Sequence, residues 1–135
     1  MVKVIAGVKG TGKTKTLIGM VNQAVASTNG SVVCIEKGEK LNFDISHKAR
    51  LIDAQSFFVE DAEALYGFIA GIAASNHDIT DIFVDSALKI CGDDKDAFER
   101  FVAQVNGLSE KFGFNCVMTA SIAPDDCGEL LKKFF

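Results

Sequence analysis

The sequence has 135 residues, of which 48% are hydrophobic, and a formal net charge of −4 at pH 7. This length suits one domain over residues 1–135 and leaves no room for a large auxiliary domain, while the acidic balance argues against non-specific nucleic-acid binding, which needs a basic surplus. Because no apolar run approaches the roughly 18 residues of a membrane span and nothing resembles a secretion signal after Met1, we expect a cytoplasmic protein that does not enter a membrane.

The chain begins with a short apolar strand and a glycine-rich loop. Val2 to Ala6 is rich in β-branched residues and predicts a buried strand. The next eight residues, Gly7 to Thr14, read G-x-x-x-x-G-K-T. A helical pattern then runs to the turn at Asn29-Gly30, so the motif has the strand–loop–helix context that it requires.

This motif predicts a phosphate-binding site. Glycines let successive backbone N–H groups point inward at phosphate oxygens, and the first turn of the helix adds free N–H donors. Lys13 is expected to reach the β- and γ-phosphates, and the Thr14 hydroxyl to bind Mg²⁺. At these residues the chain resembles the P-loop NTPase superfamily, in which this loop is called Walker A. The expected nucleotide-binding residues are Gly7, Val8, Lys9, Gly10, Thr11, Gly12, Lys13, Thr14 and Lys15. Lys9 occupies a variable position of the loop, and the alternative for it is a solvated lysine.

The segment after the first helix predicts a second strand, a loop and a second helix. Ser31 to Ile35 is an apolar run of strand length followed by Glu36, and residues 39–48 indicate a loop. Either Arg50 to Asp53 or Phe57 to Val59 is expected to be a brief edge strand. From Glu60 the pattern is helical, with acidic residues in its first turn.

A third apolar run delivers an aspartate at its end. Ile79 to Val84 predicts a buried strand, and Asp85-Ser86 follows it. Ligands of open α/β sheets bind at the carboxyl ends of strands, so Asp85 is the expected Walker B carboxylate and would hold Mg²⁺ opposite Thr14. The alternative is an aspartate that only ends a strand in a turn.

A long helix, one more strand and an amphipathic tail complete the chain. The helix is expected to be capped by Asp93 or Asp94 and to end at Gly113, with a core face made of Phe98, Phe101, Val102, Val105, Leu108 and Phe112. Phe114 to Thr119 predicts the last strand. The pattern of residues 129–135 fits either a helix or a strand.

The cysteines and histidines show no metal-binding or redox spacing. Cys34 and Cys116 lie in apolar runs and are expected to be core residues, while His47 and His77 lie in polar surroundings and are expected to be solvated. The alternation of strands and helices predicts an α/β, doubly wound three-layer sandwich with a mostly parallel sheet of four or five strands.

Within the P-loop superfamily, the element order and the Asp85-Ser86 pair resemble the RecA/KaiC-like ATPases in a minimal single-domain version. This resemblance implies the order 2-3-4-1 for the main strands, with the last strand inserted between the P-loop strand and the Walker B strand. It also implies that Thr119 or Ser121 lies beside the γ-phosphate as a sensor. Glu36 corresponds to the residue that polarises the attacking water, the alternative being a solvated turn residue.

The expected function is Mg²⁺-dependent binding of ATP (or ADP) with slow ATP hydrolysis, in which Lys13, Glu36, Thr119 and Ser121 would take part. Hydrolysis should be slow because no Glu follows Asp85 and no arginine finger is evident. Arg50 or Arg100 could act across an interface with a homo-oligomer or protein partner, but each is expected to form a surface ion pair instead. The alternatives are a non-catalytic, nucleotide-dependent interaction module and a small-molecule kinase. Guanine specificity is unsupported because no [NT]-K-x-D occurs.

Overall fold

The computed structural model describes residues 1–135, and its centre is a five-stranded sheet in which every pair of neighbouring strands is parallel. The strand order is β1-β5-β4-β2-β3. The strands are β1 (Val2–Gly7), β2 (Ser31–Glu36), β3 (Arg50–Asp53), β4 (Ile79–Val84) and β5 (Asn115–Ser121).

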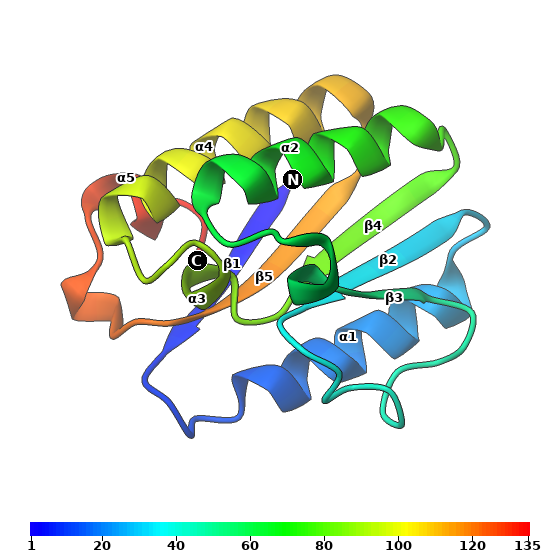
Figure 1. The fold of residues 1–135 in the computed structure, drawn as a ribbon, viewed down its shortest axis with the longest axis horizontal. Coiled ribbons are helices and arrows are strands. Elements are labelled where there is room, and N and C mark those ends of the chain that lie inside the picture. Colours follow the sequence, from blue (N-terminus) through cyan, green and yellow to red (C-terminus); the bar gives the residue numbers. More distant parts are fainter.

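Helices cover both faces of this sheet and make a three-layer α/β arrangement (Figure 1). One face carries α2 (Ala62–Ser75) and α4 (Lys95–Phe112), which pack against each other, and the other carries α1 (Lys13–Ser27). Two helices of four residues each, α3 (Ala87–Ile90) and α5 (Glu129–Lys132), and two 3-10 helices, Ala54–Phe57 and Pro124–Asp126, lie in the connections.

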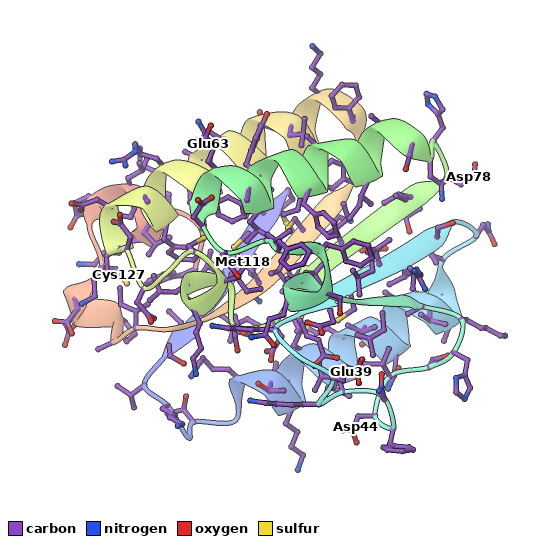
Figure 2. All side chains as sticks on the ribbon, viewed as in Figure 1. Glu39, Asp44, Glu63, Asp78, Met118 and Cys127 are labelled. Carbon is purple, nitrogen blue, oxygen red and sulfur yellow. The ribbon has the colours of Figure 1, made fainter.

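The apolar pattern of each element explains its place in these layers. Residues 32–36 of β2 are all buried, as expected for an inner strand covered on both faces. The larger core lies between the sheet and α2/α4 and includes Met118, which Figure 2 labels in the middle of the sheet. The smaller core lies beneath α1 and includes Leu17, Val21 and Phe83. This arrangement confirms the predicted α/β class and the predicted number of strands.

The sheet order agrees with the order expected for the main strands, because β5 lies between β1 and β4. The short edge strand is Arg50–Asp53, whereas Phe57 to Val59 forms no strand. The side chain of Asp61 caps α2 and that of Asp94 caps α4, each by accepting an N–H of the first turn, and Gly113 ends α4 with φ 76°. The tail contains a helix, α5, which packs against α4.

The core face of α4 is confirmed in part, and the ion pairs expected for two arginines are absent. Phe98, Phe101, Val102 and Val105 are buried, but Phe112 is 58% exposed and its assignment to the core is wrong. The reason is its place in the last turn of α4, beyond the residues that face the sheet. Arg50 and Arg100 are exposed but form no ion pair, because the one pair within 4.0 Å joins Lys132 to Glu129. The expected surface ion pairs of the two arginines are therefore wrong.

The cysteines are all free and buried, which confirms Cys34 and Cys116 as core residues. Burial, with smaller contributions from the nearby carboxylates of Asp85 and Glu36, raises the pKa of Cys34 to about 12, so its thiol stays protonated at neutral pH. His47 and His77 are exposed, as expected. No helix of the chain combines the length and the apolar character that crossing a bilayer requires.

Candidate functional site

The predicted site residues gather at the carboxyl ends of three neighbouring strands. The glycine-rich loop, defined here as Gly7 to Thr14, leaves β1 and enters α1 at Lys13. Gly7 pairs in register with Ser121 at the end of β5, and Asp85 directly follows β4 on the other side of β5. The parallel sheet therefore brings together segments that are more than 70 residues apart along the chain.

The backbone of the loop presents a row of free donors. None of the N–H groups from Lys9 to Lys15 donates a hydrogen bond within the protein, and the first intrahelical bond of α1 runs from the N–H of Thr16 to the carbonyl of Gly12 at 3.1 Å. Lys9 to Gly12 and Lys15 are exposed, and the first N–H groups of a helix have no intrahelical partner, so these donors are free to bind an anion. Positive φ angles at Gly10 (88°) and Gly12 (82°) make this course of the backbone accessible.

Two side chains of the loop turn back onto its own backbone. The hydroxyl of Thr11 donates to the carbonyl of Val8 at 2.8 Å, and the ammonium of Lys13 donates to the same oxygen at 2.9 Å. The loop is also closely packed at its start, since a Cβ added to Gly7 would lie 2.7 Å from the Thr11 hydroxyl oxygen. Lys13 thus has a single neutral partner and keeps donor capacity for a negative ligand.

A hydroxyl–carboxylate–hydroxyl network joins α1, β4 and β5. The Thr14 hydroxyl donates to the Asp85 carboxylate at 3.1 and 3.3 Å, and the Thr119 hydroxyl donates to the same carboxylate at 2.8 Å. The Thr119 oxygen in turn accepts the N–H of Ser86 at 2.7 Å. Asp85 is only 8% exposed, so these bonds fix its orientation at the edge of the site.

The donor set of this network fits a magnesium ion that is shared with phosphates. Nowhere in the chain do three or more His, Cys, Asp or Glu side chains gather as a metal site of their own. Thr14 and Asp85 instead offer one hydroxyl and one carboxylate, both hard oxygen donors. Mg²⁺ prefers such ligands and usually takes its others from phosphates and water, so these two residues suit it only together with a phosphorylated ligand.

A cavity of about 450 Å³ opens beside the loop and the Asp85 network. Five lysines line it, and Asp93 is the one acidic residue among its lining side chains. None of the five lysines is ion-paired within 4.0 Å. In a chain of net charge −4, this concentration of unpaired positive charge favours a ligand with several negative charges. The five are Lys9, Lys13, Lys15, Lys40 and Lys89.

Glu36 lies outside this cavity and is engaged by the backbone. Its side chain is 2% exposed, so the alternative of a solvated turn residue is wrong. One carboxylate oxygen accepts the N–H of Lys40 at 2.8 Å, and both oxygens lie 3.3 Å from the N–H of Leu41. Burial, despite these two backbone bonds, raises the pKa of Glu36, and the negative charges of Asp85 and Asp53 add to the effect. Its observed contacts brace the segment after β2.

The structure brings most of the predicted site residues together. Of the loop and its flank, Lys9, Gly10, Gly12, Lys13, Thr14 and Lys15 line the cavity, as do Thr119 and Ser121. Gly7, Val8 and Thr11 shape the loop without lining the cavity, and Asp85 stands behind Thr14 and Thr119. Ser121 is exposed, whereas Thr119 is buried with its hydroxyl already bonded on both sides.

Sequence reasoning missed Lys40, Lys89 and Asp93 at this cavity. Arg50 and Arg100, which it named, line other cavities. The available signal for the missed residues was their position a few residues beyond the predicted strand ends at Glu36 and Asp85, where an open α/β sheet binds its ligands. The short helix α3, which carries Lys89, was missed because four residues are too few to show a period.

Comparison of the chain with models of known protein families gives no match, and comparison with curated proteins finds no similar sequence.

Proposed function

We propose that the protein binds ATP with Mg²⁺ in the lysine-lined cavity and hydrolyses it slowly. The observation that carries the proposal is the row of unpaired N–H groups from Lys9 to Lys15 beside the Thr14–Asp85 contact. A phosphate chain is the ligand that uses both features, because its oxygens accept from the amides and also complete the ligands of a metal.

Each residue then has a distinct role. The loop amides and Lys13 hold the phosphates, while Thr14 and Asp85 support Mg²⁺, which neutralises charge on the phosphate oxygens when bound. Ser121 is exposed in the cavity and is placed to meet the phosphate end of the ligand. Thr119 orients Asp85 through the 2.8 Å hydrogen bond rather than sensing the phosphate directly.

A second candidate is a nucleotide-dependent interaction module that binds ATP without cleaving it. The specific observation in its favour is that Glu36, the expected water-polarising residue, does not line the cavity and has its carboxylate bound to backbone N–H groups. Asp93 is the one carboxylate that does line the cavity. Single-turnover measurements separate the candidates: cleavage of bound ATP within minutes supports hydrolysis, and intact bound ATP after hours supports the module. Phosphate transfer to an added acceptor instead of water would indicate a small-molecule kinase.

Nucleotide binding itself is tested by thermal unfolding with ATP, ADP, GTP and GDP, each with and without Mg²⁺ at constant ionic strength. A ligand that binds only the native state at a hundred times its Kd stabilises it by about 2.7 kcal/mol, so the Tm should rise by several degrees with ATP and Mg²⁺. Lys13→Ala should lose most of this rise.

Lys48→Ala is the matched control, since Lys48 is an exposed lysine outside the cavity. It should respond to nucleotide like the unmodified protein. If no nucleotide raises the Tm, or if Lys13→Ala and Lys48→Ala respond alike, the proposed site is wrong.

A further inference from the structure

Two of the five lysines reach the cavity from segments other than the loop. Lys9, Lys13 and Lys15 belong to the loop and the start of α1, after β1. Lys40 follows β2 and Lys89 follows β4, and the whole of β5 separates these strands from β1. The cavity therefore has a loop side, where the free amides lie. Lys40 comes from the α1 face of the sheet, where Leu41 joins the smaller core, and Lys89 comes from the α2/α4 face, where Leu88 joins the larger core. These two lysines are together called the second basic side.

The backbone that carries Lys89 is fixed, although its side chain is free. In α3 the other three residues, Ala87, Leu88 and Ile90, are buried, and Lys89 alone is exposed. Ser86, the residue before this helix, has φ 58°, and its N–H donates to the Thr119 hydroxyl oxygen at 2.7 Å. A left-handed conformation is unfavourable for a residue with a side chain, yet Ser86 adopts it directly after Asp85. The backbone turn at Ser86 holds Lys89 four positions beyond the predicted metal ligand.

The backbone that carries Lys40 is fixed by Glu36. Its N–H donates to the Glu36 carboxylate at 2.8 Å, and the next residue, Leu41, is buried and donates to the same carboxylate. The same segment is tied to β3, because the N–H of Gly38 donates to the Asp53 carboxylate at 2.7 Å. The bonds to Glu36 thus set where Lys40 enters the cavity.

We propose that Lys40 and Lys89 bind the terminal phosphate of the nucleotide and stabilise the charge that moves during its hydrolysis, in place of an arginine from another subunit. This inference rests on the proposed function. The loop amides would hold the phosphates that ATP and ADP share, and Lys13 would reach the β- and γ-phosphates. The second basic side would add contacts to the γ-phosphate, which only ATP has. Neither Lys40 nor Lys89 has an ion-pair partner that would compete with it.

In the reaction, the oxygen of a water molecule forms a bond to the γ-phosphorus while the bond from that phosphorus to the β–γ bridging oxygen breaks. The electron pair of the broken bond stays on the β-phosphate of ADP, and the proton lost by the water passes to inorganic phosphate or to solvent. Both lysines remain charged and transfer nothing; they act by placing positive charge beside the oxygens that carry the negative charge.

The test compares Lys40→Ala, Lys89→Ala and the double variant with Lys48→Ala and Lys95→Ala, which remove exposed lysines outside the cavity. Calorimetric titrations measure the Kd of ADP and of an ATP analogue with a methylene group in place of the β–γ oxygen, both with Mg²⁺. We expect each cavity variant to weaken analogue binding about tenfold while the Kd of ADP changes by less than about twofold, and the double variant to lower the single-turnover rate of ATP cleavage by about 10²-fold.

Several results would overturn the inference. It fails if the double variant weakens ADP and the analogue by the same factor, or if the controls lose as much as the cavity variants. If the unmodified protein binds both nucleotides and the cavity variants bind and cleave ATP normally, this inference fails while the proposed function stands. If the unmodified protein binds neither nucleotide, the proposed function fails, and this inference with it.

Discussion

At the scale of single residues, Glu36 has the largest difference between its expected and its observed surroundings. Its position at the end of β2 is where a water-polarising carboxylate would stand in an ATPase of the kind that the sequence resembles. In the structure its oxygens accept the N–H groups of Lys40 and Leu41 instead, and its influence on the cavity passes through the placement of Lys40. A glutamine could make the same contacts, because one amide oxygen can accept both N–H groups.

The raised pKa of Glu36 gives Glu36→Gln a defined effect on stability. A carboxyl whose pKa is higher in the folded protein than the usual value of 4.5 holds its proton more tightly when folded, so its contribution to the free energy of unfolding falls as pH rises through the interval above 4.5. Glutamine lacks this titration. Urea unfolding from pH 4 to pH 8 should therefore show Glu36→Gln gaining stability relative to the unmodified protein as pH rises.

Glu39→Gln controls for the loss of one negative charge, because Glu39 is exposed in the same segment. Figure 2 labels Glu39 near α1. If the advantage of Glu36→Gln shrank with rising pH, the carboxyl would be stabilised in its charged form. The backbone bonds would then outweigh burial, and the raised pKa of Glu36 would be incorrect. Cleavage of ATP by Glu36→Gln should persist, since the bonds that place Lys40 remain.

At the scale of elements, the strand–loop–helix at the start of the chain could be predicted because its signals are local. The apolar run of β1, the spacing of Gly7, Gly12 and Lys13, and the periodic pattern of α1 all lie within 27 residues. The carboxylate after β4 could be found for the same reason. The second basic side could not, because Lys40 and Lys89 lie in a loop and in a four-residue helix whose positions depend on Glu36 and Ser86.

The existence of a long helix was also easier to predict than the point where its buried face ends. The face of α4 follows the helical period through Val105, but the period alone could not show that the sheet no longer covers the helix at Phe112, which is 58% exposed. The tail was ambiguous because the four residues of α5 fit either a helix or a strand. The helix buries Leu131 completely, and this burial is a tertiary contact that the sequence pattern does not reveal.

Two glycines near α1 should respond oppositely to alanine. Gly12 has φ 82°, so Gly12→Ala must place a Cβ in the left-handed region and should cost about 1–2 kcal/mol of stability, even though nothing lies within 4 Å of the new atom. Gly19 is an exposed interior residue of α1 with nothing within 4 Å of an added Cβ, so Gly19→Ala should stabilise the protein by about 0.5–1 kcal/mol.

Chemical unfolding in urea measures both changes, and the pair controls for the addition of one methyl group. Equal effects of the two substitutions would contradict the strained course of the loop. Gly12→Ala should also weaken nucleotide binding, whereas Gly19→Ala should leave it unchanged, because Gly12 lines the cavity and Gly19 does not.

At the scale of the whole molecule, the site is a consequence of strand order. Only because β5 lies between β1 and β4 do Ser121, Thr119 and Asp85 form a line beside the loop, with Lys89 and Lys40 beyond it. The parallel sheet points every carboxyl end to the same edge, so residues from four separate segments share one cavity. We propose that a phosphate chain binds this edge through the free amides of the loop.

The most direct test is a two-dimensional ¹H–¹⁵N NMR titration of the protein with ATP and Mg²⁺, with adenosine as the phosphate-free control. A chain of 14.5 kDa is small enough for every amide signal to be followed. We predict that ATP shifts the signals of Lys9 to Lys15 most strongly, and that adenosine leaves them nearly unchanged. Shifts of equal size with adenosine, or shifts that centre on another cavity such as the one lined by Tyr66 and Arg100, would contradict the account.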